Sequence, residues 1–366
     1  MKFRCERDVL SEALQTVQRG VSTRPGIPAL TGVLMTAGEQ GLSLLTTDLE
    51  VSTEVRVPVE VREEGSVLVP ARLVADMVKS LSPDAVEFEA DGGQARLVCR
   101  SFEGTLRCLP AEDFPSLRGP EGTRVTVEAA AFAEAAAQVV KAASRDEARP
   151  ILTGVLLEAN REGLTMVATD SYRLAIRELR ATGDGEARAL VPERALSEAG
   201  RTAAGEEKGE LAIVLGESQA SFAIGEWRLT SRLIEGEFPN YQQLIPEPGG
   251  NRLAAPRQQL LEAVRRVGLL ARENSPVRME LNRLGARLTS SSPDLGGAVE
   301  AVEAEYEGEE VTIAFNPSYL GDGLAGAVGE RVKIELRDGL KPAVVRGEGD
   351  EFTYLVMPVR LPAPVG

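Results

Sequence analysis

The sequence predicts an α+β fold made of three tandem copies of one domain. The pentapeptide LTGVL occurs at residues 30–34 and again, 122 residues later, at 152–156. The same offset, continued without a gap, gives 15 identities over residues 30–72. A third and more diverged copy follows at the same spacing, because residues 277–293 align with residues 155–171. The repeat is longer than the roughly 20 to 50 residues of solenoid families, so each copy is expected to be a domain with its own core.

Each copy is predicted to contain a helix, two strands, a second helix and further strands. Apolar residues at helical spacing predict the helices, and alternating or β-branched runs predict the strands. Helices are predicted at 7–20, 128–144 and 256–274. The segments 68–81, 191–203 and 311–327 are each predicted to pass from a strand into a helix, with Pro70 in the first helical turn of 68–81; the leading strands are 29–37, 42–48 and 51–61. Segments rich in proline and glycine at 118–122 and 246–250 separate the copies. The predicted domains are therefore 1–120, 121–246 and 247–366.

The composition is typical of a soluble globular protein, with 43% hydrophobic and 27% charged residues. The N-terminus, MKFRCERD, passes directly into charged residues, and no apolar run approaches the ~18 residues of a membrane span. We therefore expect no signal peptide and a cytoplasmic location.

Several catalytic classes are excluded by residues that the sequence lacks. It contains no histidine, which excludes Ser-His-Asp and Cys-His catalysis. It contains no GK[ST] motif for a nucleotide-binding loop. Cys5, Cys99 and Cys108 show no CxxC spacing, so we expect buried thiols in strands and neither a disulfide nor a zinc site.

Three further motifs receive structural interpretations. GDGLAG at 321–326 fits GxGxxG, but it does not make the tight turn from strand to helix that dinucleotide binding requires, so we expect a loose helix end. Asp48 and Asp170 occupy equivalent positions in TTD and ATD and are expected to form turns. The acidic segment 300–310 is expected to be an edge strand protected by charge. No catalytic residues, cofactor or metal are predicted.

The net charge of −15 argues against nucleic acid at first sight, because non-specific DNA binding depends on lysine and arginine. The distribution of charge matters more than the sum, however. Lysines and arginines recur on the predicted helices of all three copies. On a single helix, such charges would be explained as the solvent-exposed face of an amphipathic helix. Recurrence on equivalent helices favours one shared basic surface.

Four further segments complete the pattern: VATDSYRLA (167–175), LIEGEFPNYQQLIP (233–246), FNPSYL (315–320) and YLVMPVRL (354–361). Together with the triplication, they resemble the bacterial sliding clamp family, the beta subunit of DNA polymerase III, over the whole chain. The resemblance implies two chains joined head to tail into a ring of six domains, with helices lining the inner face and antiparallel sheets outside. It implies a processivity factor that encircles duplex DNA without sequence specificity and has no catalytic site.

The partners implied by the resemblance are duplex DNA, the replicative polymerase, other polymerases and repair proteins, and a second copy of the chain. A separate clamp-loader ATPase is also expected, because the chain has no nucleotide site with which to open a ring itself. No membrane is expected among the partners. Partner proteins of the family bind between the second and third domains through short peptides with a glutamine and a leucine-phenylalanine end.

Residue roles follow from matching positions. The peptide-binding positions are Arg149, Leu152, Thr169, Ser171, Tyr172, Arg173, Leu174, Pro239, Gln243, Leu244, Asn316, Tyr319, Leu355, Met357, Pro358, Val359 and Arg360. The DNA-binding positions are Arg24, Arg72, Lys79, Lys141, Arg145, Arg149, Arg194, Arg265 and Arg266. The dimer-interface positions are Leu106, Arg107, Leu269, Leu270 and Glu300.

Some positions depart from the best-known family pattern. Ser171-Tyr172 stands where Gly-His is found in some members, Gln243 replaces an arginine and Val359 replaces a methionine. These changes are expected to alter peptide preference. The tail PAPVG (362–366) extends beyond the usual ending, next to the pocket.

Two other functions share features with the clamp. A repeat-built adaptor that binds peptides without encircling DNA has the same composition, and only the conjunction of motifs separates the two. An enzyme with a carboxylate-based site is disfavoured, because histidine, nucleotide-loop and metal motifs are lacking.

Overall fold

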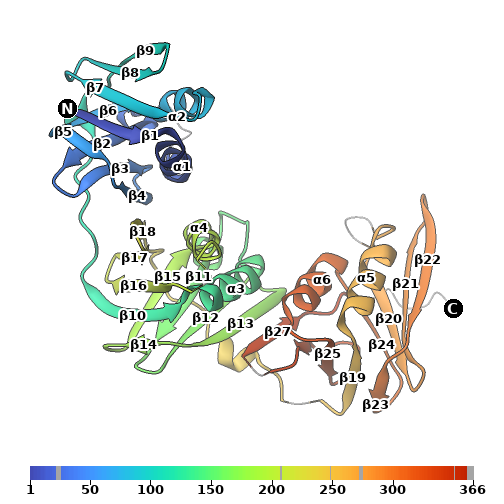
Figure 1. Cartoon of the computed structure of the whole chain (residues 1–366). Helices are drawn as coiled ribbons and strands as arrows, with labels where there is room; N and C mark the ends of the chain where they lie inside the picture. The colour runs from blue at the N-terminus through green and yellow to red at the C-terminus, as the bar shows by residue number, and fades with distance from the viewer. Residues whose placement is uncertain (22–25, 207, 248, 272–274, 350, 361–366) are drawn as a thin grey trace. The chain divides into compact units, whose positions relative to one another are not determined.

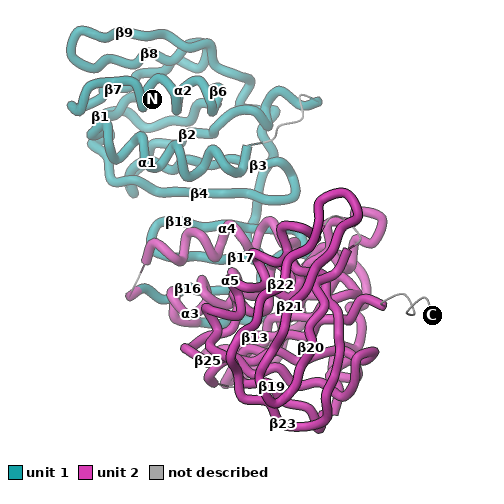
Figure 2. The backbone as a smooth tube through the Cα atoms, turned by 90° about the vertical axis from the view of Figure 1, so that its right-hand side faces the viewer, with its two compact units in different colours: residues 1–126, 209–233 teal, residues 127–208, 234–366 magenta. Residues whose placement is uncertain are grey.

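The computed structural model describes residues 1–366 except 22–25, 207, 248, 272–274, 350 and 361–366. The described chain forms two compact units (Figure 2), one of residues 1–126 and 209–233 and the other of residues 127–208 and 234–366. The boundaries expected between the three repeat copies stay a prediction.

The first unit packs two helices against two antiparallel sheets. Its helices are α1 (Arg7–Val17) and α2 (Ala71–Ser80), with short 3-10 turns η1 (Gln18–Gly20), η2 (Pro28–Thr31) and η3 (Ala111–Asp113). The smaller sheet has the order β5-β1-β7-β8-β9, formed by Glu60–Glu63, Lys2–Glu6, Ala85–Ala90, Gln94–Cys99 and Phe102–Arg107. The core lies between the helices and the strands and includes Leu10, Leu14, Val74 and Phe88.

The larger sheet of the first unit includes the order β16-β17-β18-β4-β3-β2-β6. These strands are Glu210–Gly216, Gln219–Ile224, Trp227–Arg232, Val51–Val57, Gly41–Thr47, Gly32–Gly38 and Gly65–Pro70. The chain passes from the first unit to the second in β10 (Gly122–Glu128).

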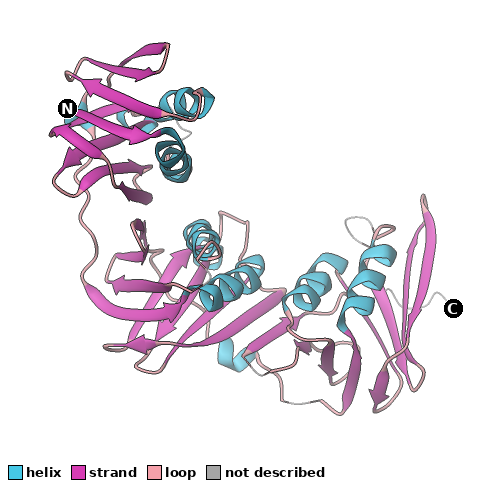
Figure 3. Ribbon diagram, in the orientation of Figure 1, coloured by secondary structure: helices cyan, strands magenta, loops and turns pink. Residues whose placement is uncertain are grey.

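The second unit contains four helices: α3 (Ala129–Val139), α4 (Glu193–Ala203), α5 (Arg257–Gly268) and α6 (Pro317–Gly326). Helix α3 packs against both α4 and α6, and α6 packs against α5. The four helices therefore lie in the order α4-α3-α6-α5, each packed against the next, and strands of this unit pack against them (Figures 1 and 3). Its 3-10 turns are η4 (Val140–Ala142), η5 (Pro150–Thr153) and η6 (Tyr241–Leu244).

A nine-stranded sheet joins the middle and last parts of the chain in the second unit. Its order is β15-β11-β12-β13-β27-β26-β25-β19-β23, formed by Ala187–Pro192, Gly154–Ala159, Gly163–Thr169, Arg173–Arg180, Phe352–Val356, Ala343–Arg346, Arg331–Leu336, Asn251–Pro256 and Glu305–Glu307. The antiparallel pairing of β13 with β27 sets Leu174 opposite Leu355. This pairing places the turn before β13 beside the C-terminal segment, although the two are far apart in sequence.

A four-stranded sheet, β22-β21-β20-β24, and the two-residue β14 (Thr182–Gly183) complete the second unit. The four strands are Gly296–Val302, Gly285–Ser292, Val277–Asn282 and Val311–Phe315. The acidic segment 300–310 therefore contributes to two edge strands, β22 and β23, of two different sheets. The expectation of a charged edge strand is confirmed, although one continuous strand is not formed.

The repeated LTGVL is a transition from a 3-10 turn to a strand. In the first copy the Thr31 hydroxyl donates to the Pro28 carbonyl at 2.7 Å, and in the second Thr153 donates to Pro150 at 2.7 Å. A Cβ on Gly32 would lie 2.7 Å from the Leu68 side chain, and one on Gly154 would lie 2.9 Å from Leu190. These leucines belong to the repeated LVP, so the two motifs recur together because they pack on each other.

Five expectations about local structure need correction. The strand expected at 51–61 is divided into β4 (Val51–Val57) and β5 (Glu60–Glu63), which belong to different sheets. The strand expected at 29–37 starts at Gly32, because residues 28–31 form η2. The helices expected at 7–20 and 128–144 end as α-helix at Val17 and Val139 and continue as 3-10 turns. The helix expected at 256–274 ends at Gly268.

The expectations for the cysteines and for GDGLAG were partly wrong. Cys5 and Cys99 are buried in strands, but Cys108 is half-buried and follows β9. GDGLAG is the second half of α6 and not a loose end. Its glycines permit close packing, because a Cβ on Gly323 would lie 2.4 Å from the Tyr354 ring.

Replacing Gly323 by alanine should destabilise the second unit. The added methyl would collide with the buried Tyr354 ring, and such overpacking costs about 1–3 kcal/mol. Gly321 is the matched control, because it lies in the same helix and a Cβ there would meet nothing within 4 Å. We expect Gly323→Ala to lower the thermal unfolding midpoint and Gly321→Ala to leave it unchanged or raise it. Equal midpoints for the two variants would contradict this packing.

Candidate functional site

The turn between β12 and β13 is built by its own side chains. Asp170 Oδ1 accepts hydrogen bonds from the backbone N–H groups of Tyr172 (2.9 Å) and Arg173 (3.0 Å). Thr169 Oγ1 donates to the Arg173 carbonyl at 2.6 Å and accepts from the Ser171 N–H at 3.1 Å. Ser171 has a φ of +79°, a conformation that these bonds support.

The equivalent turn in the first unit is made in the same way. Asp48 Oδ1 accepts from the N–H groups of Glu50 (3.1 Å) and Val51 (2.8 Å), and Leu49 has a φ of +76°. The prediction that Asp48 and Asp170 form turns is therefore confirmed.

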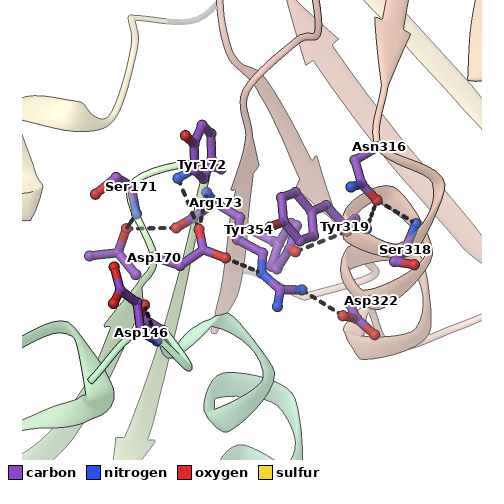
Figure 4. Close-up of polar contacts among 12 residues, drawn as sticks. Asp146, Asp170, Ser171, Tyr172, Arg173, Asn316, Ser318, Tyr319, Asp322 and Tyr354 are labelled. Carbon is purple, nitrogen blue, oxygen red and sulfur yellow. Dashed lines mark hydrogen bonds and ion pairs between the residues drawn. The ribbon is translucent and has the colours of Figure 1, made fainter. Parts of the chain in front are cut away.

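Asp170 has a second task, because its other oxygen binds a side chain. Asp170 Oδ2 accepts from Arg173 Nε at 3.0 Å, and Arg173 Nη1 donates to Asp322 Oδ2 at 2.5 Å (Figure 4). Only 12% of the Arg173 side chain and 10% of the Asp170 side chain are exposed. The guanidinium therefore binds one carboxylate in the turn before β13 and one on helix α6, and so links the two elements. Such charge-assisted hydrogen bonds are strong when the N–H groups and the carboxylates are well aligned.

Aromatic rings cover this ion pair. The Arg173 guanidinium carbon lies 4.3 Å from the centroid of the Tyr319 ring, within cation–π distance. Tyr319 in turn stacks on Tyr172, with ring centroids 6.4 Å apart. The Tyr354 hydroxyl donates to the Tyr319 carbonyl at 2.9 Å. This hydrogen bond holds the first turn of α6 against strand β27.

The protonation of these groups follows from their surroundings. Burial disfavours the charged form of Arg173, but the carboxylates of Asp322 and Asp170 more than offset it and raise its pKa. Burial raises the pKa of both Tyr319 and Tyr354. Arg173 is therefore charged and both phenols are neutral across the physiological pH range.

Helix α6 is positioned by its first residues. Asn316 is the N-cap, and its Oδ1 accepts from the N–H groups of Ser318 (2.9 Å) and Tyr319 (3.3 Å). Pro317 occupies the first helical position, where the missing N–H costs nothing. Tyr319 lies in the first turn of the helix that this cap begins, as Figure 4 shows.

A pocket of about 450 Å³ opens at this cluster, entirely within the second unit. It is lined by Ala143, Ser144, Arg145, Asp146, Arg149, Asp170, Tyr172, Arg173, Ser318, Tyr319 and Asp322. We call it the tyrosine pocket. Its size and its mixture of aromatic and charged groups suit a few side chains of a peptide.

Four of the expected peptide-binding residues line the tyrosine pocket: Arg149, Tyr172, Arg173 and Tyr319. Arg149 is held at its edge by Asp146 (2.9 Å) and by the Ser171 hydroxyl (3.3 Å). Sequence reasoning missed Asp146 and Asp322 as lining residues. Asp322 falls within GDGLAG, whose helical periodicity was not recognised.

Other expected positions form the packed support behind the pocket. Leu174 and Leu355 are 2% and 4% exposed and belong to one apolar cluster with Phe238 and Tyr241. Leu152 and Thr169 are also buried. These residues fix the shape of the site more than they offer free surface.

A further group lies on the surface. Leu244, Met357 and Val359 are 49%, 43% and 36% exposed and offer apolar surface to solvent. The Met357 N–H donates to the Tyr172 carbonyl at 2.8 Å, so it lies beside the pocket turn. Pro239, Gln243 and Arg360 are exposed, Ser171 is exposed, and Pro358 and Asn316 are half-buried. The tail 362–366 lies outside the described residues.

The expected DNA-binding residues are mostly exposed on helices or their ends. Arg72 and Lys79 lie on α2 in the first unit, and Arg194 lies on α4 in the second. Arg145 and Arg149 line the tyrosine pocket. Arg24 lies outside the described residues.

Lys141 and Arg265 share a groove of about 440 Å³ beside α5 and α6. We call it the basic groove. Arg266, the next residue on α5, is differently placed, because Glu300 binds it with two hydrogen bonds of 2.6 and 3.0 Å and Glu262 adds a third. Its charge is largely neutralised within the chain.

The expected dimer-interface residues differ in their exposure. Leu269 is 79% exposed, Leu270 is half-buried and Arg107 is exposed. Leu106 is only 3% exposed, because its side chain points from β9 into the core, and its place at the interface stays a prediction. Glu300 is bound by Arg266, which holds the pKa of the carboxyl below its usual range.

Membrane-spanning helices and metal sites are absent from the described part of the chain. No described helix is long and apolar enough to cross a membrane. Within the same residues, no three His, Cys, Asp or Glu side chains are grouped as a metal site requires.

The fold and pocket define a class of protein: three tandem α+β domains with adjoining helices on antiparallel sheets are the fold of the DNA clamps. Three domain profiles match in order, the N-terminal, central and C-terminal domains of the DNA polymerase III beta subunit, at residues 1–118, 126–240 and 242–360. The chain belongs to this family.

Individual relatives agree over nearly the full length. The chain is 40% identical to the beta sliding clamp of Streptomyces coelicolor, covering 99% of this chain and 100% of the relative. Its structure is similar to a Pseudomonas aeruginosa DnaN sliding clamp bound to griselimycin, with a TM-score of 0.94, 33% identity and coverage of 99% and 100%. A DNA polymerase sliding clamp from Bacillus subtilis is similar at a TM-score of 0.94 and 30% identity, covering 99% of this chain and 100% of that one.

Replacing Asp170 by asparagine should separate its two tasks. The amide oxygen still accepts the two backbone hydrogen bonds of the turn, but the negative charge beside Arg173 is lost. We expect the variant to lower the free energy of unfolding by about 1.5–3 kcal/mol, the worth of a hydrogen bond to a charged group. The loss should be much smaller when Arg173 is already replaced by methionine. Additive losses in this double-mutant cycle would show that the two side chains do not interact.

Proposed function

We infer that this chain is a DNA sliding clamp, which holds a replicative polymerase on duplex DNA so that synthesis is processive. The observation that carries this conclusion is the full-length match to beta sliding clamps in all three domains. Sliding requires contacts that carry no sequence information, and lysines and arginines facing phosphates provide such contacts. The clamp acts as a processivity factor and not as a catalyst.

The tyrosine pocket and its apolar surroundings are the proposed binding site for short peptides of partner proteins. Exposed Tyr172, Leu244 and Met357 offer apolar surface, and the buried cluster behind them keeps that surface in place. Aromatic and aliphatic anchors in a rigid site usually contribute most to binding. The polymerase, other polymerases and repair proteins, and the clamp loader would share this site.

The proposed DNA contacts are made by the exposed basic residues of the helices, with Lys141 and Arg265 supported by their shared groove. Further candidates for DNA contacts are Arg72 and Lys79 on α2 and Arg194 on α4. Arg266 is the weakest of these proposals, because Glu262 and Glu300 already bind it. The acidic remainder of the protein would discourage DNA from binding elsewhere.

The proposed ring forms when β9 of one copy pairs with β22 of another. Each is the last strand of its sheet, and unpaired edge strands tend to find partners. Leu269 follows the end of α5, and Val299 lies on β22. Both side chains are exposed in the single chain and would become buried in this interface. Leu106 would support β9 from the core, while Arg107 lies at the exposed edge.

Loading onto closed DNA is proposed to require a separate ATPase, and the protein is proposed to act in the cytoplasm. An adaptor that binds peptides without encircling DNA shares the tyrosine pocket. The full-length similarity to sliding clamps favours the clamp over that adaptor.

Processive synthesis tests the proposed function. On a primed circular template with a beta-dependent polymerase, a clamp loader and ATP, the protein should convert short products into full-length circles. Tyr172→Ala should reduce this stimulation about tenfold or more, because loss of an aromatic anchor that becomes buried when the peptide binds costs over 1 kcal/mol. Glu280→Gln is the control, because Glu280 lies on β20, a strand that contributes no residue to the lining of the tyrosine pocket. Unchanged product length with the wild-type protein would refute the clamp.

Dimerisation tests the proposed interface. Leu269→Asp changes a side chain that is 79% exposed, so the single chain should fold normally. A buried charge at an interface should weaken association about 100-fold. Leu284→Asp is the matched control, because Leu284 is 87% exposed in a turn of the same unit. Light scattering should give two chains for the wild type and the control, and one for Leu269→Asp. A dimeric Leu269→Asp variant would place the interface elsewhere.

A further inference from the structure

The tyrosine pocket and the basic groove lie on either side of helix α6 and share two lining residues, Ser318 and Asp322. Asp322 is the single carboxylate among the described residues that line the basic groove, where Lys141 and Arg265 supply positive charge. In the tyrosine pocket its carboxylate binds Arg173. One side chain therefore faces two sites with different proposed ligands.

We propose that Asp322 is a positioning residue of the peptide site and that it makes peptide binding depend on whether a phosphate of duplex DNA occupies the basic groove. This inference rests on the proposed function and deepens it.

The positioning role follows from what Asp322 holds. Its carboxylate fixes one end of the Arg173 guanidinium, while Asp170 fixes the other (Figure 4). The guanidinium supports the Tyr319 ring, and that ring stacks on Tyr172. The exposed face offered to a peptide thus depends on a carboxylate that the peptide itself need not touch.

Asp322 is well placed to respond to the groove, because it is less buried than the other acid. Its side chain is 33% exposed, against 10% for Asp170. Asp170 also accepts hydrogen bonds from two backbone N–H groups of its turn, whereas Arg173 is the one side chain among the described residues that donates to Asp322. Of the two carboxylates that bind Arg173, Asp322 is therefore the one that can pair with another cation.

The sign of the coupling follows from charge. With the groove empty, Lys141 and Arg265 attract the Asp322 carboxylate and compete with Arg173 for it. A phosphate in the groove neutralises these two cations, so Arg173 remains the favoured partner of Asp322. The Arg173–Tyr319–Tyr172 stack is then more firmly held, and peptide binding improves. Linkage requires that peptide in turn strengthens DNA binding by the same factor.

The test measures binding of a fluorescent peptide, with a glutamine and a leucine-phenylalanine end, to the full-length protein at constant salt. Each titration is done with and without a short linear duplex. For the wild type we expect the duplex to tighten peptide binding about fivefold, the lower end of known coupling factors. Asp322→Asn should bind the peptide about tenfold more weakly and lose the duplex effect. Asp322→Glu, which restores the charge, should recover part of both.

Asp146→Asn is the matched control, because Asp146 lines the tyrosine pocket but not the basic groove. It should keep the duplex effect whatever it does to peptide affinity. Thermal unfolding of Asp322→Asn shows whether the variant is folded, and recovery by Asp322→Glu distinguishes positioning from a general loss of structure.

Equal peptide affinity for Asp322→Asn and the wild type would overturn the positioning role. A duplex effect that persists in Asp322→Asn would overturn the coupling, and in both cases the clamp function would stand. A wild-type protein that does not bind the peptide at all would overturn the proposed peptide site together with this inference.

Discussion

The site depends on one buried cation, Arg173, held between Asp170 and Asp322. The two acids come from different parts of the chain, one from the turn before β13 and one from α6. A buried charge without partners would be strongly unfavourable, so the guanidinium requires both elements in place. The pairing of β13 with β27 and the capped start of α6 supply that geometry. The exposed aromatic face of the pocket is thus a consequence of an ion pair beneath it.

One of the residues that differ between the two matching turns explains why the site forms at the second turn and not at the first. The turns at Asp48 and Asp170 share their hydrogen bonds, and both follow from the same TD sequence. Only the second turn carries an arginine at the position that reaches the carboxylate, since Val51 stands where Arg173 does. A common framework is kept by glycines and leucines that pack on each other. Function is added by single residues that differ between copies.

The sequence predicted the architecture better than the site. The LTGVL repeat predicted tandem domains. The prediction was possible because the LVP leucines, on which the LTGVL glycines pack, recur at the same spacing. The roles of Asp48 and Asp170 were predictable because they arise from bonds within five residues. Helix ends were placed less well, since 3-10 turns at 18–20 and 140–142 keep the helical pattern of apolar residues.

Long-range contacts account for most of what was missed. Asp322 lies 149 residues from Arg173, and nothing in GDGLAG identifies its ion pair. The inward direction of Leu106 depends on the packing of β9 over the first unit's core, which the local sequence does not specify. The binding of Arg266 by Glu300 likewise joins a helix to an edge strand that sequence patterns treat separately. Resemblance supplied the positions of the pocket, while the structure supplied the interactions that hold it.

Topological retention on DNA tests the central claim most directly. The protein would be loaded onto a nicked circular plasmid with a clamp loader and ATP, washed in high salt, and the plasmid then cut once. A ring should remain on the circle, because salt screens charges but does not open a closed ring, and it should leave the linear ends after cutting. Equal loss from circular and linear DNA would contradict the clamp and leave only electrostatic binding.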